Sequence, residues 1–181
     1  MKSAKRFYVI YFNGFSLKGE EALFSSYLLE NDTTVAGFSY GAQKALEYVY
    51  QNTTQRIDRL ILLSPAFFQT QKPSFIRTQL RYFNTDKEAY IKQFLQNASK
   101  PSSIDLSPYV HIGTQEELEA LLTYTWEKEK IQSIINRDIA IEVFLGKKDK
   151  IIPIDEAIKF FTHTTHYIIK DAGHILRRSD G

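Results

Sequence analysis

Short apolar runs alternate with stretches of helical periodicity along this chain, and that alternation restricts the fold more than any other feature. The runs end at pairs typical of turns, such as Asn13-Gly14 and Ser64-Pro65, and helical spacing follows the first two runs over residues 20–30 and 42–50. Strands that alternate with helices are typical of an α/β fold with a mostly parallel sheet flanked by helices. The runs are residues 7–12, 33–37, 60–63, 139–145 and 167–169.

The span from residue 67 to residue 130 interrupts this alternation. It contains no convincing strand-like run, and its apolar residues follow a helical period. An all-helical insertion between two strands of a parallel sheet predicts a cap over the strand ends. We therefore expect a core formed by residues 1–66 and 131–181 and a helical cap, or lid, formed by residues 67–130. The helical patterns cover residues 75–83, 87–96 and 114–126.

Length and composition exclude several classes of protein. The chain has 181 residues, the size of about one domain. It contains no cysteine, which excludes a disulfide framework, a thiol nucleophile, iron–sulfur clusters and cysteine-ligated zinc. The net charge of +2 is too small to indicate nucleic-acid binding, and no apolar run reaches the roughly 20 residues of a membrane helix. We expect a cytoplasmic protein with no nucleic-acid or membrane partner.

The pentapeptide Gly37-Phe38-Ser39-Tyr40-Gly41 lies at the junction of a predicted strand and a predicted helix. A serine in this pattern occupies a sharp, strained strand-to-helix turn that exposes its hydroxyl at the start of the helix. Small residues on both sides let the backbone make that turn. A glycine-rich turn without chemistry is the alternative, but the strand before it and the helix after it favour a nucleophilic Ser39.

A serine nucleophile needs a base, and the base needs an acid that orients it. Asp149 and His174 follow Ser39 in the chain, each just after a predicted strand. Because open α/β sheets place their sites beyond the carboxyl ends of the strands, we expect these three side chains to meet. Three further aspartates are weaker candidates because of their positions in the chain: Asp138, Asp155 and Asp171.

With its serine, acid and histidine in this order, the chain resembles the α/β-hydrolases over nearly its whole length, from Tyr8 to His174. The resemblance implies a catalytic triad of Ser39, Asp149 and His174, with no metal and no other cofactor. The chain departs from the usual pattern in two ways: 24 residues separate Phe15 from Ser39, and seven follow His174. We therefore expect a trimmed fold that lacks an additional strand and helix before the serine and a closing helix at the end.

The compact core with its helical insertion more closely resembles the short, BioV-type pimeloyl-acyl-carrier-protein methyl ester esterases of biotin synthesis. That resemblance implies hydrolysis of the methyl ester of pimeloyl-acyl carrier protein to pimeloyl-acyl carrier protein and methanol. It also implies acyl carrier protein as the partner. It rests on the chain as a whole, because the triad motifs do not specify an acyl group.

An oxyanion hole is the next requirement, and the resemblance implies that two backbone N–H groups form it. One belongs to Tyr40, directly after the nucleophile, and the other to Phe15, in the loop after the first strand. Such donors stabilise the negative charge that develops on the substrate oxygen. This chain has Asn13 where the family usually has histidine, a change compatible with the hole because the donors are main-chain groups. A plain Asn-Gly turn is the alternative.

The predicted cap divides into halves of opposite charge. Residues 67–100 carry a net charge of +4, and residues 101–130 carry −4. Arg77 and Arg81 are four apart, so a helix places them on one face. They indicate either binding of an acidic carrier protein or pairing between the two halves, and the sequence favours neither. The candidate substrate- and carrier-binding residues are Arg77, Arg81, Lys92, Phe38 and Phe68.

Two other functions stay open on the sequence alone. The same triad would serve a general short-chain carboxylesterase or an acyl thioesterase. The alternative of another class is a non-catalytic hydrolase fold that acts as a binding module. The presence of a serine, an acid and a histidine at all three expected positions argues against the binding module.

Overall fold

The computed structural model of the chain describes residues 9–28 and 31–180, and within them five strands form one sheet. All neighbouring strands are parallel, in the order β1-β2-β3-β4-β5. The α/β fold with a parallel sheet is therefore confirmed, although residues 7 and 8 of the first predicted run lie outside the described residues. The strands are β1 (Ile10–Phe12), β2 (Thr34–Phe38), β3 (Arg59–Leu63), β4 (Ala140–Gly146) and β5 (Thr165–Ile169).

The middle of the sheet is buried on both faces, which explains why its strands appear as continuous apolar runs in the sequence. All five residues of β2 and the last four of β3 are buried. The register aligns Phe12, Gly37 and Leu62 across the first three strands. The carboxyl ends of β1 and β2 therefore lie side by side, where their loops can form one site.

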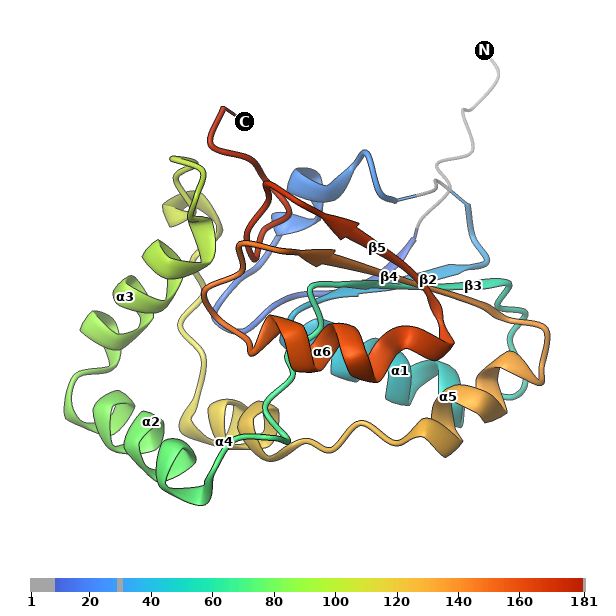
Figure 1. The fold of residues 1–181 in the computed structure, drawn as a ribbon, viewed down its shortest axis with the longest axis horizontal. Coiled ribbons are helices and arrows are strands. Elements are labelled where there is room, and N and C mark those ends of the chain that lie inside the picture. Colours follow the sequence, from blue (N-terminus) through green and yellow to red (C-terminus); the bar gives the residue numbers. More distant parts are fainter. Residues whose placement is uncertain (1–8, 29–30, 181) are drawn as a thin grey trace, which may run out of the picture.

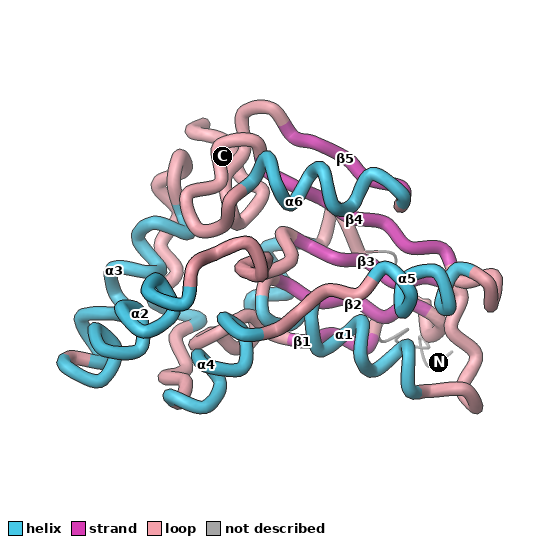
Figure 2. Tube along the Cα trace, turned by 60° about the horizontal axis from the view of Figure 1, so that its bottom comes forward, coloured by secondary structure: helices cyan, strands magenta, loops and turns pink. Residues whose placement is uncertain are grey.

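Three helices lie on the same face of the sheet. They are α1 (Tyr40–Gln51), α5 (Lys128–Ile135) and α6 (Ile154–Phe160), and Figures 1 and 2 show them side by side along the strands. Each precedes the next strand of the sheet, and right-handed crossovers that advance in one direction place their helices on one face. The short 3-10 helix η1 (Glu20–Phe24) lies on the opposite face (Figure 1), and η3 (Phe161–His163) extends α6.

The segment between β3 and α5 forms a helical layer beyond the carboxyl ends of the strands. Figure 1 shows this layer in green and yellow at the end toward which the strand arrows point. Asp86 caps α3 by accepting a hydrogen bond from the Ala89 N–H, and Thr114 and Glu117 form a capping box at the start of α4. The layer consists of α2 (Pro73–Thr85), α3 (Lys87–Ser99), η2 (Ser107–Tyr109) and α4 (Gln115–Thr123).

Two predicted helices differ from the observed ones. The helix expected over residues 20–30 is the five-residue 3-10 helix η1, followed by turns at Ser25 and Ser26, residues whose side chains compete with helical hydrogen bonds. The helix expected over 114–126 ends at Thr123, and the chain then enters α5. The division of the chain at residues 66/67 and 130/131 stays a prediction, and its second boundary falls within α5.

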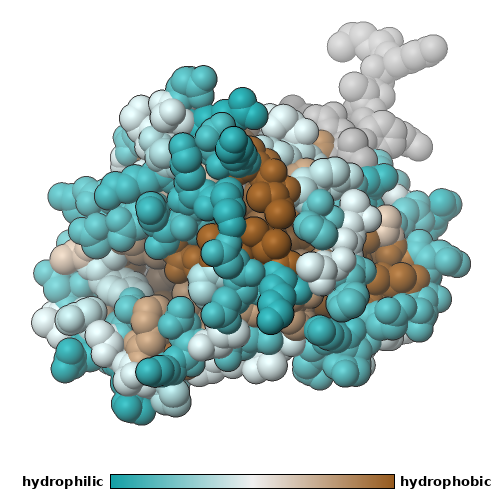
Figure 3. Space-filling model, in the orientation of Figure 1, coloured by the Kyte–Doolittle hydropathy of each residue, from teal (hydrophilic) through white to brown (hydrophobic). Residues whose placement is uncertain are grey.

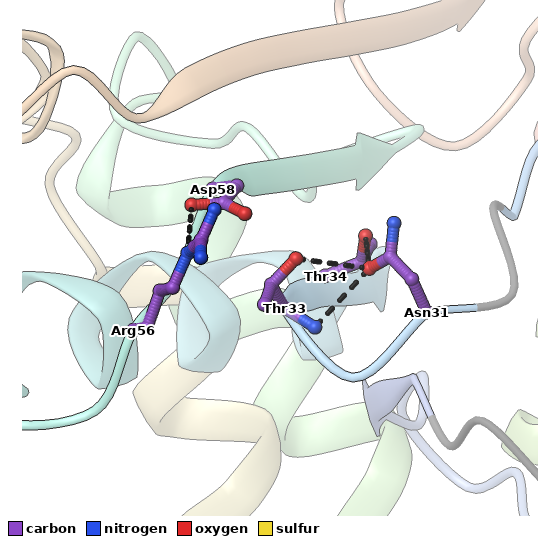
Figure 4. A network of polar contacts seen from close by, with 5 residues as sticks. All are labelled: Asn31, Thr33, Thr34, Arg56 and Asp58. Atoms are coloured by element: carbon purple, nitrogen blue, oxygen red, sulfur yellow. Dashed lines mark hydrogen bonds and ion pairs between the residues drawn. The ribbon is translucent and has the colours of Figure 1, made fainter.

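A small polar network surrounds the amino ends of β2 and β3, opposite the helical layer (Figure 4). The Asn31 Oδ1 accepts hydrogen bonds from the Thr33 N–H at 3.1 Å and from the Thr34 hydroxyl at 2.6 Å. Nearby, Arg56 and Asp58 form an exposed ion pair at 3.0 Å. Asparagine side chains that bond to the backbone two residues later form turns, so this network turns the chain into β2.

The surface is unevenly apolar. On the face shown in Figure 3, apolar side chains gather over β4, β5 and the C-terminal segment, whereas the exposed side of α3 is hydrophilic. Tyr167 and Ile168 of β5 are among the exposed large apolar side chains. Within the described residues, no helix combines the length and the apolar character needed to cross a membrane.

Candidate active site

Ser39 lies in the turn between β2 and α1, and its backbone is strained. Its φ of 55° and ψ of −113° fall in a region that residues with a side chain rarely occupy. Three main-chain hydrogen bonds hold it there: the Ser39 N–H donates to the Leu63 carbonyl, and the N–H groups of Ala42 and Ala66 donate to the Ser39 carbonyl. The turn that the pentapeptide predicts is therefore present.

The two glycines of the pentapeptide are required by close backbone contacts. A Cβ atom on Gly37 would lie 2.1 Å from the carbonyl oxygen of Gly41, and one on Gly41 would lie 1.9 Å from the carbonyl oxygen of Phe12. Both distances are far below van der Waals contact, and the atoms met are main-chain atoms that cannot rotate away. Only glycine therefore allows α1 to start this close to β1 and β2.

Asp149 occupies the loop after β4 and is fixed by main-chain donors. Its Oδ1 accepts hydrogen bonds from the N–H groups of Ile151 at 2.7 Å and Ile152 at 3.2 Å. Its Oδ2 lies 2.6 Å from Nδ1 of His174. The carboxylate is buried, with 7% of the residue exposed, so one oxygen is anchored in its own loop while the other is aimed at the histidine.

His174, in the loop after β5, connects the acid to the serine. Its Nε2 lies 2.9 Å from the Ser39 Oγ, and its ring is fully buried against the ring of Phe38. Because a carboxylate only accepts hydrogen bonds, Nδ1 donates to Asp149, and in the neutral ring Nε2 is left to accept from the serine hydroxyl. The structure thus brings the three predicted side chains into one hydrogen-bonded line.

Two of the rival aspartates and one other histidine have partners outside the site. Asp155 pairs with Lys147, and Asp171 lies 3.4 Å from Lys148. His166 bonds through Nδ1 to a main-chain carbonyl of its own turn. No cluster of three or more possible metal ligands occurs within residues 9–28 and 31–180.

Both predicted oxyanion donors lie near Ser39, but only Phe15 is among the residues that line the cavity containing it. Tyr40 is the first residue of α1, so its N–H has no partner within the helix. Phe15 is buried in the loop after β1 and lines the cavity that contains Ser39. Among the described residues, neither N–H donates to an acceptor, so both are free to bind a substrate oxygen.

A cavity of about 300 Å³ opens above Ser39, between the sheet and the helical layer. Its walls combine aromatic and aliphatic side chains with neutral polar ones, and among the described residues that line it only Lys150 is charged. Burial raises the pKa of Tyr90 to about 12, so its hydroxyl stays neutral and donates to Gln79. The cap residues in the wall are Phe68, Phe75, Gln79, Tyr82, Tyr90, Gln93, Phe94, Asn97, Leu118, Leu121 and Leu122.

The five predicted substrate- and carrier-binding residues occupy different places. Phe68 lines the cavity, whereas Phe38 lies beneath the site, almost fully buried between Phe24 and the histidine ring. Arg77 and Arg81 are exposed on α2, and Lys92 is exposed on α3 and borders a second, separate groove. The structure therefore does not gather these five residues into one site.

Sequence reasoning missed the polar wall of the cavity. Gln79 on α2 and Gln93 and Asn97 on α3 line it together with Lys150, next to the acid. The signal was the helical period, because positions 75, 79 and 82 share one face of α2. Counting aromatic residues alone hid the amides on that face.

Comparisons with known proteins bear on the fold. No family model matches the sequence, and no curated protein is detectably similar to it. Among solved structures, an esterase from Exiguobacterium antarcticum matches with a TM-score of 0.50 and 19% identity, over 86% of this chain and 63% of that chain. A bromoperoxidase from Bacillus anthracis matches with a TM-score of 0.59 and 15% identity, over 87% and 65% of the two chains.

A longer match covers a carboxylesterase structure from the thaumarchaeon Nitrososphaera gargenis. It has a TM-score of 0.62 and 13% identity, over 96% of this chain and 85% of that chain. The chain spans less than two thirds of the length of the esterase and the bromoperoxidase named above. Together with the parallel sheet and the turn at Ser39, these similarities show that the chain has the α/β-hydrolase fold.

Proposed function

We propose that the protein is a serine hydrolase that cleaves carboxylic esters. The observation that carries this proposal is the line of contacts from Ser39 Oγ to His174 Nε2, at 2.9 Å, and from His174 Nδ1 to Asp149 Oδ2, at 2.6 Å. Ser39 Oγ attacks the ester carbonyl while His174 Nε2 takes the hydroxyl proton. Asp149 holds the ring in the required tautomer and stabilises its charged form.

The remaining steps use the same groups. The N–H groups of Phe15 and Tyr40 bind the negatively charged oxygen of the tetrahedral intermediate. Collapse of this intermediate breaks the ester bond, and His174 gives its proton to the departing alcohol. A water molecule then attacks the acyl-enzyme and loses a proton to His174, which forms a second tetrahedral intermediate. Collapse of this intermediate releases the acid, and His174 returns its proton to Ser39 Oγ.

As the substrate we propose the methyl ester of pimeloyl-acyl carrier protein, cleaved in the cytoplasm during biotin synthesis. The support is the whole-chain resemblance to short esterases of this kind, together with a cavity that suits a neutral acyl chain. Its volume of about 300 Å³ is at the small end of the usual range for ligand sites. Eight of its lining residues are Phe, Leu or Ile.

The charges of the cap support a protein-bound substrate. Within the described chain, no ion pair joins residues 67–100 to residues 101–130, although the pKa of Glu116, lowered mainly by local hydrogen bonds, is lowered further by the charge of Lys87. Arg77 and Arg81 are exposed on α2, the helix that sends Gln79 and Tyr82 into the cavity wall. At about 100° per residue these arginines lie on nearly the opposite face of α2 from Gln79 and Tyr82. They form a positive surface on the outer side of the helix, which fits an acidic carrier protein by charge complementarity.

Labelling with a fluorophosphonate tests the chemistry. The wild-type protein is expected to be labelled on Ser39 and to hydrolyse p-nitrophenyl butyrate, whereas Ser39→Ala does neither. Absence of both in the wild type would favour a binding module. A higher kcat/KM for acyl thioesters than for methyl esters of the same acyl chain would favour a thioesterase.

Rescue of growth tests the substrate. A biotin-requiring strain that lacks its own pimeloyl methyl ester esterase is expected to grow without biotin when it carries the wild-type gene. The Ser39→Ala gene is expected to fail. An active esterase that does not rescue growth would overturn the proposed substrate while leaving the ester chemistry intact.

A further inference from the structure

Glu20, the first residue of η1, is a fully buried carboxyl group close to the loop that carries Phe15. Its Oε1 accepts hydrogen bonds from the Gly14 N–H at 2.6 Å and from the Tyr11 hydroxyl at 3.2 Å. Its Oε2 is buried and has no hydrogen-bond partner among the described residues. The next residue, Glu21, is exposed. Two adjacent glutamates thus have opposite environments.

Burying a carboxyl group in this way is unfavourable. Within the described chain no lysine or arginine pairs with Glu20, and desolvation raises its pKa above the usual value. A buried polar group with one unsatisfied oxygen costs stability that an apolar side chain of the same size would not. In exchange, Glu20 supplies a hydrogen-bond acceptor for the Gly14 N–H, which an apolar residue could not supply.

The contacts of Gly14 explain why that hydrogen bond matters. The Gly14 carbonyl accepts from the Leu17 N–H at 3.2 Å, while its own N–H is held by Glu20. A Cβ atom on Gly14 would lie 2.8 Å from the ring of Phe38, which packs on His174. The main chain at Gly14 is therefore held at both polar groups and pressed against the ring that supports the histidine.

The direction of the Phe15 N–H depends on the first of these hydrogen bonds directly and on the second through the backbone of Gly14. That N–H shares a peptide plane with the Gly14 carbonyl, and in a trans peptide the two groups point in opposite directions. Because Leu17 binds the carbonyl on one side, the Phe15 N–H points to the other side, where no acceptor lies among the described residues. Glu20 holds the preceding peptide plane, between Asn13 and Gly14, and so restrains the φ of Gly14, on which the orientation of the next plane depends.

We propose that Glu20 is a positioning residue, which holds the Gly14 main chain so that the Phe15 N–H is presented to the developing oxyanion. The inference rests on the proposed function, because it assigns a role within that reaction. Glu20 touches neither the substrate nor Ser39 and acts through Gly14. The group it supplies is a hydrogen-bond acceptor, not a charge.

A pair of variants of equal length separates these roles. Glu20→Gln and Glu20→Met are both neutral and nearly equal in size, but only glutamine keeps an acceptor for Gly14. The matched controls are Glu21→Gln and Glu21→Met on the surface. The measurements are kcat and KM for p-nitrophenyl butyrate, the Ki of phenylboronic acid, whose adduct with the serine places an oxygen in the oxyanion hole, and the thermal unfolding of each variant.

Glu20→Met is expected to lower kcat by about tenfold or more with little change in KM, and to raise the Ki of phenylboronic acid by the same factor. Glu20→Gln is expected to stay within about threefold of the wild type in both quantities, as are the Glu21 variants. A folded Glu20→Met protein with wild-type kcat would overturn the inference. So would a Glu20→Gln protein as slow as Glu20→Met, because charge rather than the acceptor would then matter.

Amide hydrogen exchange on the wild-type protein tests the same point without a variant. The Gly14 amide is expected to exchange slowly, and the Phe15 amide to exchange fast until saturating phenylboronic acid protects it. A Phe15 amide unaffected by phenylboronic acid would overturn the inference. A wild-type protein that neither hydrolyses the ester nor labels with fluorophosphonate would overturn the proposed function itself, which distinguishes the two failures.

Discussion

The carboxyl end of the sheet and the helical layer above it are built in different ways. Ser39, Asp149 and His174 are almost fully buried, and main-chain contacts hold each of their loops. In the layer above, α2 has one buried residue, Phe83, while α3 and α4 have three each. The candidate active site therefore lies at the well-packed end of the sheet, whereas the outer wall of its cavity belongs to a thinner layer of helices.

Side chains attach part of this layer to the sheet side, in addition to main-chain hydrogen bonds from Lys18 to Tyr109 and from His111 to Ser16. The Gln43 amide on α1 donates to the carbonyl groups of Ala66 and Leu121, and the Trp126 indole N–H donates to the same Ala66 carbonyl. These bonds join the start and the end of the layer at one point. Such an arrangement allows the helices between them to change more readily than the sheet.

The largest expected effect is the loss of activity when Ser39 or His174, at the sheet end, is replaced. Ser39→Ala and His174→Ala should each lower kcat for p-nitrophenyl butyrate by more than about 10³-fold, because either change removes the nucleophile or its base. Circular dichroism and thermal unfolding should show that both variants stay folded. Activity within tenfold of the wild type in either variant would contradict the triad.

The core of the fold was predictable because its signals are local. Five apolar runs that end in turn residues specify the strands of a parallel sheet, and the pentapeptide around Ser39 specifies a strand-to-helix turn by sterics alone. Chain order then placed Asp149 and His174 at the correct ends of β4 and β5. None of these inferences required knowledge of contacts between distant residues.

The rest of the site depended on contacts that no local pattern encodes. Nothing around Glu20 indicates that its side chain is buried beneath the loop of Gly14 while Glu21 is exposed. Phe38, next to Ser39 in sequence, points into the core because side chains of successive strand residues alternate between the two faces. The hydrogen bonds of Trp126 to Gln69 and Ala66, just after the end of α4, likewise join residues distant in sequence.

The next largest expected effect is a difference in stability between two glycine-to-alanine variants, one at the sheet end and one in the helical layer. Gly41→Ala should lower the free energy of unfolding by more than about 3 kcal/mol, because its Cβ would lie 1.9 Å from a main-chain oxygen. Gly113→Ala, in the helical layer, meets the Phe15 side chain first, at 2.6 Å. A side chain can shift, so this variant should lose less stability.

Urea unfolding of both glycine variants provides the measurement, with the slope of each transition checked against the wild type. Equal losses of stability would contradict the contrast between a rigid sheet end and a more adaptable layer. A Gly41→Ala protein that unfolds like the wild type would contradict the close contact with β1.

Charge reversal on α2 tests the recognition assigned to the layer. Arg77→Glu combined with Arg81→Glu should raise KM for the carrier-bound ester by about tenfold and weaken its salt dependence, since exposed charges steer an acidic partner. Turnover of p-nitrophenyl butyrate should change by less than about twofold. The comparison is steady-state kinetics on the two substrates at several salt concentrations.

The control reverses two charges outside the layer, with Arg56→Glu and Lys159→Glu. It changes the net charge by the same amount and should leave kcat and KM for both substrates unchanged. An equal loss on both substrates in the α2 variant would mean that the arginines stabilise the layer and do not recognise a partner.

The smallest expected effect is the pH dependence that the titration of Glu20 gives to the free energy of unfolding. Burial raises its folded-state pKa above the ordinary value of 4.5, and the groups that face it are the Tyr11 hydroxyl and the Glu21 carboxyl. A raised folded pKa means that the native state binds the proton more tightly than the unfolded chain. The free energy of unfolding should therefore fall as the pH rises from about 4.5 to the folded pKa, by at most about 1.4 kcal/mol per pH unit.

Glu20→Gln removes this titration, so its stability relative to the wild type should increase over the same range in urea unfolding, with Glu21→Gln as the surface reference. A difference that stays constant between pH 4 and pH 8 would contradict the buried, unpaired carboxyl group.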